Sequence, residues 1–487
     1  MIHSPANIPL PTSADEAARK AFAERRRIEF DRCLHSFADQ FREWKERTET
    51  TTWATHYSQV RAIETLLVGV CDKVKKEAEA AKSESDFPEI LPEFEKAILS
   101  GWRVWEFFRG KLAQRQEEHF QAGLRAADEL AWACRMSLAE AALEAGNLSP
   151  KEPALVFLNG NASPVALARG LEFWAESAPG LGQVDKYCKT LLEHVPVPLI
   201  SLPWHEVWHA PGITAVAHEA GHVVEKDFKL EPDLDAVLKA VVSEAGVQNE
   251  QEAEWLKWRA EVFADFFAVR NCGPGYVGML ADVLVGTESD ETKYPPTDLR
   301  MELCFAGLEQ MDLPDEADSR RQAWRQLTKT NLPTSKAELA TKVVIGLAKT
   351  PLKTFGNKPI GELVVFDQER LKHSLRIASS LGEGWRPDQP TDPQLLATAA
   401  RLLYEQKPRT FEDDGGSLDV FELIAAIGAG QRRGLMRRSS VASGPTSEQM
   451  KGAIERAANV LLSNIRERRK SNGAARREAS GQRPKQE

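Results

Sequence analysis

Apolar residues follow a helical period over the first third of the chain. From Ser13 to Asn147 they recur every three or four positions within long, strongly charged stretches. Two prolines interrupt this pattern between Ser83 and Pro92. Because proline ends or kinks a helix, we expect antiparallel helices on either side of a loop. The pattern therefore predicts a helical bundle domain over residues 1–150.

The pattern changes after residue 150. Two short apolar segments, residues 154–160 and 195–203, are bounded by turn residues and are the best strand candidates. The second contains Pro196 and Pro198, which cannot donate hydrogen bonds to a neighbouring strand. We therefore expect this segment at a sheet edge or simply extended, where it could pair with an extended peptide.

The middle of the chain predicts three helices, over residues 213–228, 233–246 and 251–271. The first follows Pro211, a residue that suits a first helical turn. The third is apolar almost all round after Trp255, as expected of a helix in a domain centre. It is predicted to end at the Cys-Gly-Pro-Gly sequence of residues 272–275, a strong stop signal.

The remainder again predicts helices separated by loops that contain proline and glycine. One further helix is expected over residues 448–469, and the polar, basic segment beyond it is expected to be disordered. The fold class predicted is mainly α, with an α+β core that contains a small sheet. The domains expected are the helical bundle (1–150), the core (151–310), a helical region (311–430) and a basic, partly disordered tail with one helix (431–487).

The composition argues against nucleic-acid-binding, disulfide-rich and membrane proteins but does not point to a particular function. The 487 residues include 42% hydrophobic and 28% charged residues, and the net charge of −9 gives no general case for nucleic-acid binding, which only the basic tail leaves open. Six cysteines are scattered singly, which favours buried free thiols over a disulfide framework. No apolar run approaches the roughly 18 residues of a membrane span or forms a signal peptide. We expect a cytoplasmic protein without a membrane partner.

The sequence matches H-E-x-x-H twice, at residues 205–209 and 218–222. On an α-helix this spacing places two imidazoles one turn apart, where they can share a metal ion. The first match lies between Pro203 and Pro211, which leaves room for little more than one helical turn. The second lies within the predicted helix 213–228 and is therefore the candidate metal site.

Apolar residues on both sides of the second match predict that its helix is buried. Two histidines and a glutamate buried without partners would be costly, so a shared metal is the simpler explanation. We predict a Zn²⁺ site with His218 and His222 as ligands. Glu219 projects close enough to act on a metal-bound water without being a ligand. The small pair Ala220 and Gly221 allows close backbone approach.

A catalytic zinc takes three protein ligands and keeps an open position. Residues 223–246 contain no histidine, which excludes the metzincin pattern. Glu261 and Asp265 instead lie four apart on the third predicted helix among apolar residues, where a carboxylate must be paired or metal-bound. Glu261 is the predicted third ligand, with Glu254 as the alternative. Asp265 is expected to accept the outer N–H of a ligand histidine.

The sequence His-Glu-Ala-Gly-His at 218–222, followed by a helix with Glu261 and Asp265 in an E-x-x-A-D pattern, resembles the gluzincin group of zinc metallopeptidases. The resemblance covers roughly residues 195–310. It implies a zincin-like core, thermolysin-like in its catalytic site, and hydrolysis of peptide bonds in a cytosolic protein or peptide. Glu219 would then take a proton from the zinc-bound water and deliver it to the leaving amine. The wider gap between the two helices and the large helical flanks leave the subfamily open.

Such sites usually add a donor that stabilises the tetrahedral oxyanion. The turn from Tyr294 to Arg300 contains two candidates, Tyr294 and Arg300 themselves, and His205 and His209 are upstream alternatives. Two other functions stay open at this point. The same zinc chemistry could hydrolyse a bond other than a peptide, or the helical regions could make the chain a regulatory or interaction protein with a gated or dormant peptidase site.

Overall fold

A computed structural model describes residues 16–50, 54–80, 87–147, 152–167, 186–246, 249–287, 290–386, 392–438 and 447–479. It is mostly helical with small sheets, which confirms the predicted mainly α class. The chain divides into two compact units, each assembled from separate stretches. One comprises residues 1–107, 174–194 and 447–487, and the other comprises residues 108–173 and 195–446. The four consecutive domains expected from the sequence stay a prediction.

The first unit consists of long helices. They are α1 (Glu16–Thr50), α2 (Tyr57–Glu79), most of α3 (Phe87–Ala113), the short α6 (Lys186–Leu192) and α18 (Ser447–Ala479). Apolar residues at helical spacing on α2, such as Val60, Ile63 and Leu67, are completely or almost completely buried. On α1 and α3, the rings of Phe41 and Trp105 pack with centroids 4.5 Å apart. The period in the sequence therefore did identify core-facing helix surfaces.

The basic segment after residue 469 was predicted to be disordered, and this is wrong as far as Ala479, because α18 continues to that residue. Its alanines, arginines and glutamates are strong helix formers, so a polar composition did not prevent a helix. Residues 480–487 lie outside the described part of the chain.

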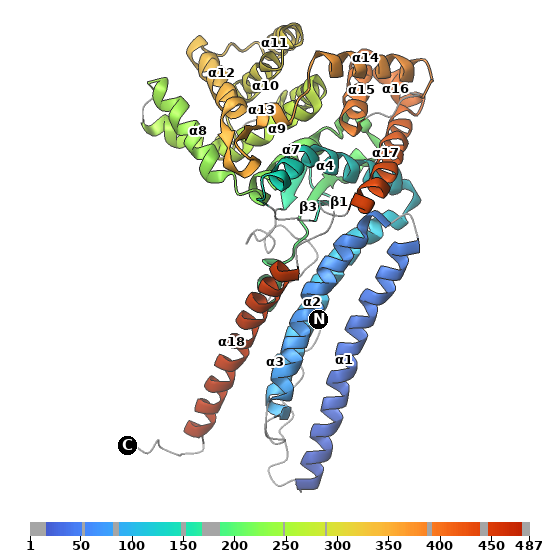
Figure 1. Ribbon diagram of the computed structural model, residues 1–487, viewed down its shortest axis with the longest axis vertical. Helices are drawn as coiled ribbons and strands as arrows, with labels where there is room; N and C mark the ends of the chain where they lie inside the picture. The colour runs from blue at the N-terminus through green and yellow to red at the C-terminus, as the bar shows by residue number, and fades with distance from the viewer. Residues whose placement is uncertain are drawn as a thin grey trace. The chain divides into compact units, whose positions relative to one another are not determined.

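The second unit carries the sheet and the candidate site. Its principal elements in chain order are α4 (Glu118–Glu144), β1 (Leu155–Asn159), β2 (Val165–Leu167), β3 (Leu199–Pro203), the 3₁₀ segments η3 (Trp204–Trp208) and η4 (Ala210–Gly212), α7 (Ala215–Asp227), α8 (Glu231–Glu244), α9 (Asn249–Leu284), α10 (Thr297–Gln310), α11 (Pro314–Thr328), α12 (Thr334–Lys349), the hairpin β4 (Pro351–Leu352) and β5 (Lys358–Pro359), α13 (Ile360–Leu363), α14 (Gln368–Gly382), α15 (Pro393–Gln406), α16 (Pro408–Asp413) and α17 (Gly416–Arg438). Figure 1 shows α7 and α4 beside the strands, and α9 packs against α7, α8, α10 and α15.

The three-stranded sheet has the order β1-β3-β2, with β3 parallel to β1 and antiparallel to β2. For residues 195–203 the sequence left a sheet edge or a merely extended segment open. The sheet edge is wrong, because β3 is central, and residues 195–198 precede the strand. The strand begins at Leu199, after both prolines, and Pro198 contributes only its carbonyl, which accepts from the N–H of Leu155 at 2.9 Å. All five residues of β3 are buried, as in a central strand.

The helix predicted over residues 251–271 ends at the Cys-Gly-Pro-Gly sequence, as predicted, because Gly273 is not helical (φ 49°, ψ −133°). No loop follows, because the chain kinks at Gly273 and a second helical segment of α9 continues to Leu284. A Cβ at Gly273 would lie 2.4 Å from the Phe366 ring, so both conformation and space require glycine. Proline fits directly after the kink because it starts the second helical segment. Tyr276 consequently lies on a helix rather than in a loop.

Two further observations bear on composition. All six cysteines are free and five are buried, whereas Cys33 is exposed, contrary to the expectation that each is buried. Among the described residues, no helix is both long enough and apolar enough to cross a membrane.

Candidate metal centre

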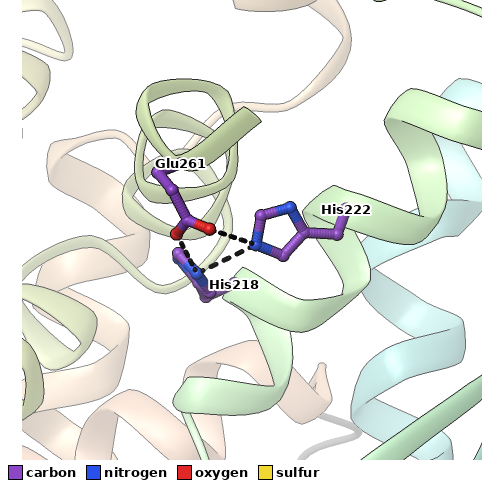
Figure 2. A group of neighbouring side chains, drawn as sticks. All are labelled: His218, His222 and Glu261. Carbon is purple, nitrogen blue, oxygen red and sulfur yellow. Dashed lines mark hydrogen bonds and ion pairs between the residues drawn. The ribbon is translucent and has the colours of Figure 1, made fainter. Parts of the chain in front are cut away.

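Two helices bring the three predicted ligands together. His218 and His222 lie one turn apart on α7, and Glu261 lies on α9. Nε2 of His218 is 3.2 Å from Nε2 of His222 and 3.3 Å from Oε2 of Glu261, and Oε1 of Glu261 is 3.6 Å from Nε2 of His222 (Figure 2). In the part of the chain that the structure describes, this is the one group of three such side chains able to hold a metal.

The spacing of these atoms suits a zinc ion. Ligands about 2.0–2.1 Å from a tetrahedral zinc lie about 3.3 Å from one another, close to the observed separations. Oε2 of Glu261 is buried and has no hydrogen bond from a described residue. Two imidazoles and a carboxylate that face one another in a buried site need a positive charge among them, which a proton or a metal ion can supply. The donor set of two nitrogens and one oxygen therefore fits zinc.

Gly221 lets the two helices approach closely enough for this arrangement. A Cβ at Gly221 would lie 2.9 Å from Cα of Ala264 on α9 and 3.3 Å from the Phe267 ring. A side chain at this position would push α9 away from α7 and Glu261 away from the histidines. The sequence prediction that the small pair at 220–221 permits close backbone approach is confirmed.

Arg259 fixes the same helix pair from its other side. Its Nε donates to Oε1 of Glu225 on α7 at 2.9 Å, and its Nη1 donates to Asp235 on α8 at 2.9 Å. The Glu225 side chain is fully buried. Because Arg259 lies two residues before Glu261, these bonds hold the start of the ligand-bearing part of α9 against α7.

Asp265 contacts the ring nitrogen of His218 that does not face the other two ligands. Its Oδ1 lies 2.8 Å from Nδ1 of His218, the contact that its predicted role requires. Arg300 donates from Nε to Oδ2 of Asp265 at 2.5 Å and from Nη2 to Oδ1 at 2.9 Å. Tyr276 donates its hydroxyl to Oδ1 at 2.5 Å. All these side chains are buried, so Asp265 is held in one orientation.

Electrostatics in the metal-free protein follow from these contacts. Burial on its own lowers the pKa of His218, but the hydrogen bond and negative charge of Asp265 outweigh it and raise the pKa to about 10. Burial opposes ionisation of Glu261 and Asp265, yet both carboxyl pKa values are well below their usual range. For Glu261 the cause is the interaction with His218 and His222, which face its carboxylate, and for Asp265 it is the charge of Arg300. The cluster of His218, His222 and Glu261 therefore favours a positive charge, which in the metal-free protein is the proton on His218.

Glu219 lies beside this group in a cavity of about 490 Å³, which His218 also lines. Burial raises the pKa of the Glu219 carboxyl, although the charges of His218 and His222 lower it. A carboxyl with a raised pKa exchanges protons closer to neutral pH than an exposed one. Ala166 of β2 also hydrogen-bonds Glu219 through its backbone, so the sheet edge reaches the same carboxyl.

Tyr294 and Arg300 both line the cavity, but they differ in what their polar atoms contact. The Tyr294 hydroxyl makes no hydrogen bond to any described residue, and burial and the charge of Glu261 raise its pKa, which keeps it protonated. The Arg300 guanidinium is engaged by Asp265 and lies 5.2 Å from the centroid of the Tyr294 ring. This arrangement favours Tyr294 as the donor to a ligand and Arg300 as the residue that positions Asp265.

The alternatives weighed from the sequence lie elsewhere. Glu254 is exposed on α9 and takes no part in the cluster. The first H-E-x-x-H match lies on η3, a 3₁₀ segment, where the His205 side chain is 57% exposed and Nδ1 of His209 lies 2.8 Å from Oε1 of Glu412. Neither histidine of this match belongs to the metal cluster.

Sequence reasoning missed Tyr276. Tyr276 lies beyond the kink at Gly273, on the second helical segment of α9, so its contact with Asp265 depends on the direction of the chain after the kink. The spacing of the two residues in the sequence does not reveal that contact. Comparison of the chain with protein-family models, with curated proteins and with solved structures gave no match in any of the three.

Proposed function

We propose that this chain is a zinc-dependent peptidase with a gluzincin-type site and a zincin-like core in its second unit. The observation that carries the proposal is the convergence of His218, His222 and Glu261 beside a cavity that also contains Glu219. Two histidines one turn apart and a carboxylate on a later helix form the donor set of a hydrolytic zinc, and the glutamate between the histidines is placed to act as a base. The substrate in this proposal is a protein or peptide.

His218, His222 and Glu261 would hold the ion, and Asp265 would keep the His218 ring in the tautomer that directs Nε2 to it. When bound, zinc supplies a Lewis acid that polarises a carbonyl and lowers the pKa of water. Glu219 acts as general base and then general acid. Its carboxylate accepts a proton from the attacking water and returns this proton to the nitrogen of the leaving amine as the peptide C–N bond breaks.

Tyr294 supplies the donor for the oxyanion in this proposal, because its hydroxyl is protonated and free of other described partners. Arg300 acts through Asp265 and does not touch the reacting atoms.

An extended peptide would pair with β2. In the described sheet β2 is an edge, and the backbone of its Ala166 lies beside Glu219. A peptide added there would place its backbone along the cavity in the manner of β-strand addition. This role was predicted for the segment 195–203, whose strand residues 199–203 are instead in the sheet centre.

The test measures zinc content and cleavage of a random peptide library by wild type and by Glu219→Gln. We expect one zinc per chain in both proteins, cleavage by wild type, and a loss of at least about a hundredfold in kcat for the variant, as for removal of a general base. Zinc without cleavage of any peptide would contradict peptidase activity. Ester and non-peptide amide libraries would then separate a different hydrolase from a dormant site. A protein that binds no zinc would refute the whole proposal.

A further inference from the structure

Glu206, the glutamate of the first H-E-x-x-H match, places a second carboxylate in the cavity that contains Glu219. Its Oε2 atom is buried and has no hydrogen bond from a described residue. Its Oε1 atom lies 3.7 Å from Nε2 of the exposed His205, beyond hydrogen-bond range. Burial raises the pKa of Glu206, although the charges of His209 and His205 lower it. The carboxylate therefore lacks a close cation.

The arginines that line this cavity are already paired with carboxylates. Arg300 pairs with Asp265 at 2.5 Å and Arg401 pairs with Asp282 at 2.6 Å. The lining histidines also contact carboxylates, with His218 Nδ1 2.8 Å from Asp265 and His209 Nδ1 2.8 Å from Glu412. Asp290, on the rim, adds a further negative charge and bonds to Thr292. Because a carboxylate in a partly buried site is stabilised by a cation, Glu206 is suited to receive one from a ligand.

The distance from the Glu206 carboxylate to the metal ligands can be estimated from Gly212. A Cβ at Gly212 would lie 2.0 Å from Oε2 of Glu206, so the carboxylate packs directly on Gly212. Gly212 precedes His218 by six residues, and at a helical rise of about 1.5–2.0 Å per residue this corresponds to about 10 Å. An extended peptide covers this distance in about three residues. A lysine or arginine side chain adds its own length, so a basic residue can lie fewer than three residues from the metal ligands.

We propose that Glu206 binds a positively charged group of the substrate and selects peptides that carry such a group within about three residues of the bond that is cleaved. The group is an ammonium or guanidinium ion, from either the peptide amino terminus or a lysine or arginine side chain. This inference rests on the proposed peptidase function. In this proposal the match at 218–222 takes part in peptide hydrolysis, and the glutamate of the match at 205–209 determines which peptides bind.

The experiment measures equilibrium binding to zinc-loaded, full-length Glu219→Gln protein, so that peptides are bound but not cleaved. The ligands are four pools of random hexapeptides that contain no arginine or histidine and no lysine at the random positions. Each pool has either a free or an acetylated amino terminus, and either lysine or norleucine at one added site whose position varies among the peptides. We expect the acetylated norleucine pool, which has no cation, to bind at least about tenfold more weakly than the best pool. The two singly charged pools identify whether the amino terminus or the side chain is recognised.

Three further variants, made in the same background, assign the effect to Glu206. Glu206→Gln should abolish the preference, and Gly212→Ala should reduce it, because the added methyl displaces the carboxylate without touching the metal ligands. Asp290→Asn removes a rim charge and should leave the preference within about twofold. Equal or undetectable binding of all four pools, or a preference that survives Glu206→Gln, would overturn the inference. Library cleavage by wild type tests peptidase activity separately, so the two failures are distinguishable.

Discussion

The chain contains the same five-residue pattern twice, and only one copy forms a metal cluster. The copy at 218–222 lies within an α-helix, where positions four apart differ by about 40° around the axis. The copy at 205–209 starts on the 3₁₀ segment η3, which ends at Trp208, and His209 has the non-helical angles φ −123° and ψ 83°. The histidines of the first copy therefore diverge, with one exposed and one bonded to Glu412. A continuous α-helix is what lets the pattern share an ion.

The second difference between the copies is the partner element. His218 and His222 face α9, which supplies Glu261 as a ligand and Asp265 as a support. The first copy has no such carboxylate pair among its described contacts, and its own Glu206 turns toward the cavity. A local pattern is thus insufficient, and the helix packed against it completes the site.

The largest expected effect comes from removing a ligand. His222→Ala should weaken zinc binding by more than about a hundredfold, because even support residues around a ligand are worth tenfold to a hundredfold. His209→Ala, the matched change in the first copy, should leave zinc affinity within about twofold. Competition with a chromophoric chelator measures both. Equal losses in the two variants would remove the distinction between the copies.

Asp265→Asn should weaken zinc binding by about tenfold to a hundredfold, because the His218 ring loses its anionic support. It also leaves the buried Arg300 without a carboxylate, which should lower the free energy of unfolding by about 3–5 kcal/mol. Chelator competition and urea unfolding measure the two effects. Glu412→Gln, which affects the carboxylate partner of His209, serves as the control and should not change zinc affinity.

Gly221→Ala should destabilise the protein by about 1–3 kcal/mol, because the new Cβ would meet the backbone of Ala264 at 2.9 Å. Gly212→Ala, next to the first copy, meets only a movable carboxylate and should cost less. Urea unfolding of both variants compares them directly. A Gly221→Ala protein as stable as wild type would show that the helices are not in close contact.

The smallest expected effect is a proton released on metal binding. The pKa of His218 is about 10 in the metal-free protein, so its ring is protonated at pH 7.5 and must lose that proton to bind zinc. Zinc affinity should therefore fall about tenfold for each pH unit below 10 from this group. Titration calorimetry in buffers of different ionisation enthalpy should detect about one proton from His218 in wild type and in His205→Ala. Absence of proton release would contradict the His218–Asp265 contact.

The sequence was sufficient for the parts of the site that depend on local rules. Prolines at 203 and 211 limited the first copy to about one turn, and the apolar surroundings of Glu261 and Asp265 marked them as buried carboxylates. Helices α7, α8 and most of α9 followed from periodicity.

The remaining features depend on tertiary structure. The central place of β3 is set by pairing partners on both sides, which two prolines preceding the strand concealed. The continuation of α9 depends on the fit of Gly273 against Phe366, a contact across 93 residues of sequence. The hydroxyl of Tyr276 reaches Asp265 because the chain continues as a helix after the kink at Gly273. Likewise, the first unit is assembled from stretches far apart in the chain, which no local pattern reveals.

The most direct measurement is an anomalous-difference map at the zinc edge from crystals grown with zinc. The account predicts one strong protein-bound peak, about 2.0–2.2 Å from Nε2 of His218, Nε2 of His222 and the Glu261 carboxylate. A peak at His205 and His209 instead, or an empty cluster in zinc-saturated crystals, would contradict the assignment of the metal site to the second copy.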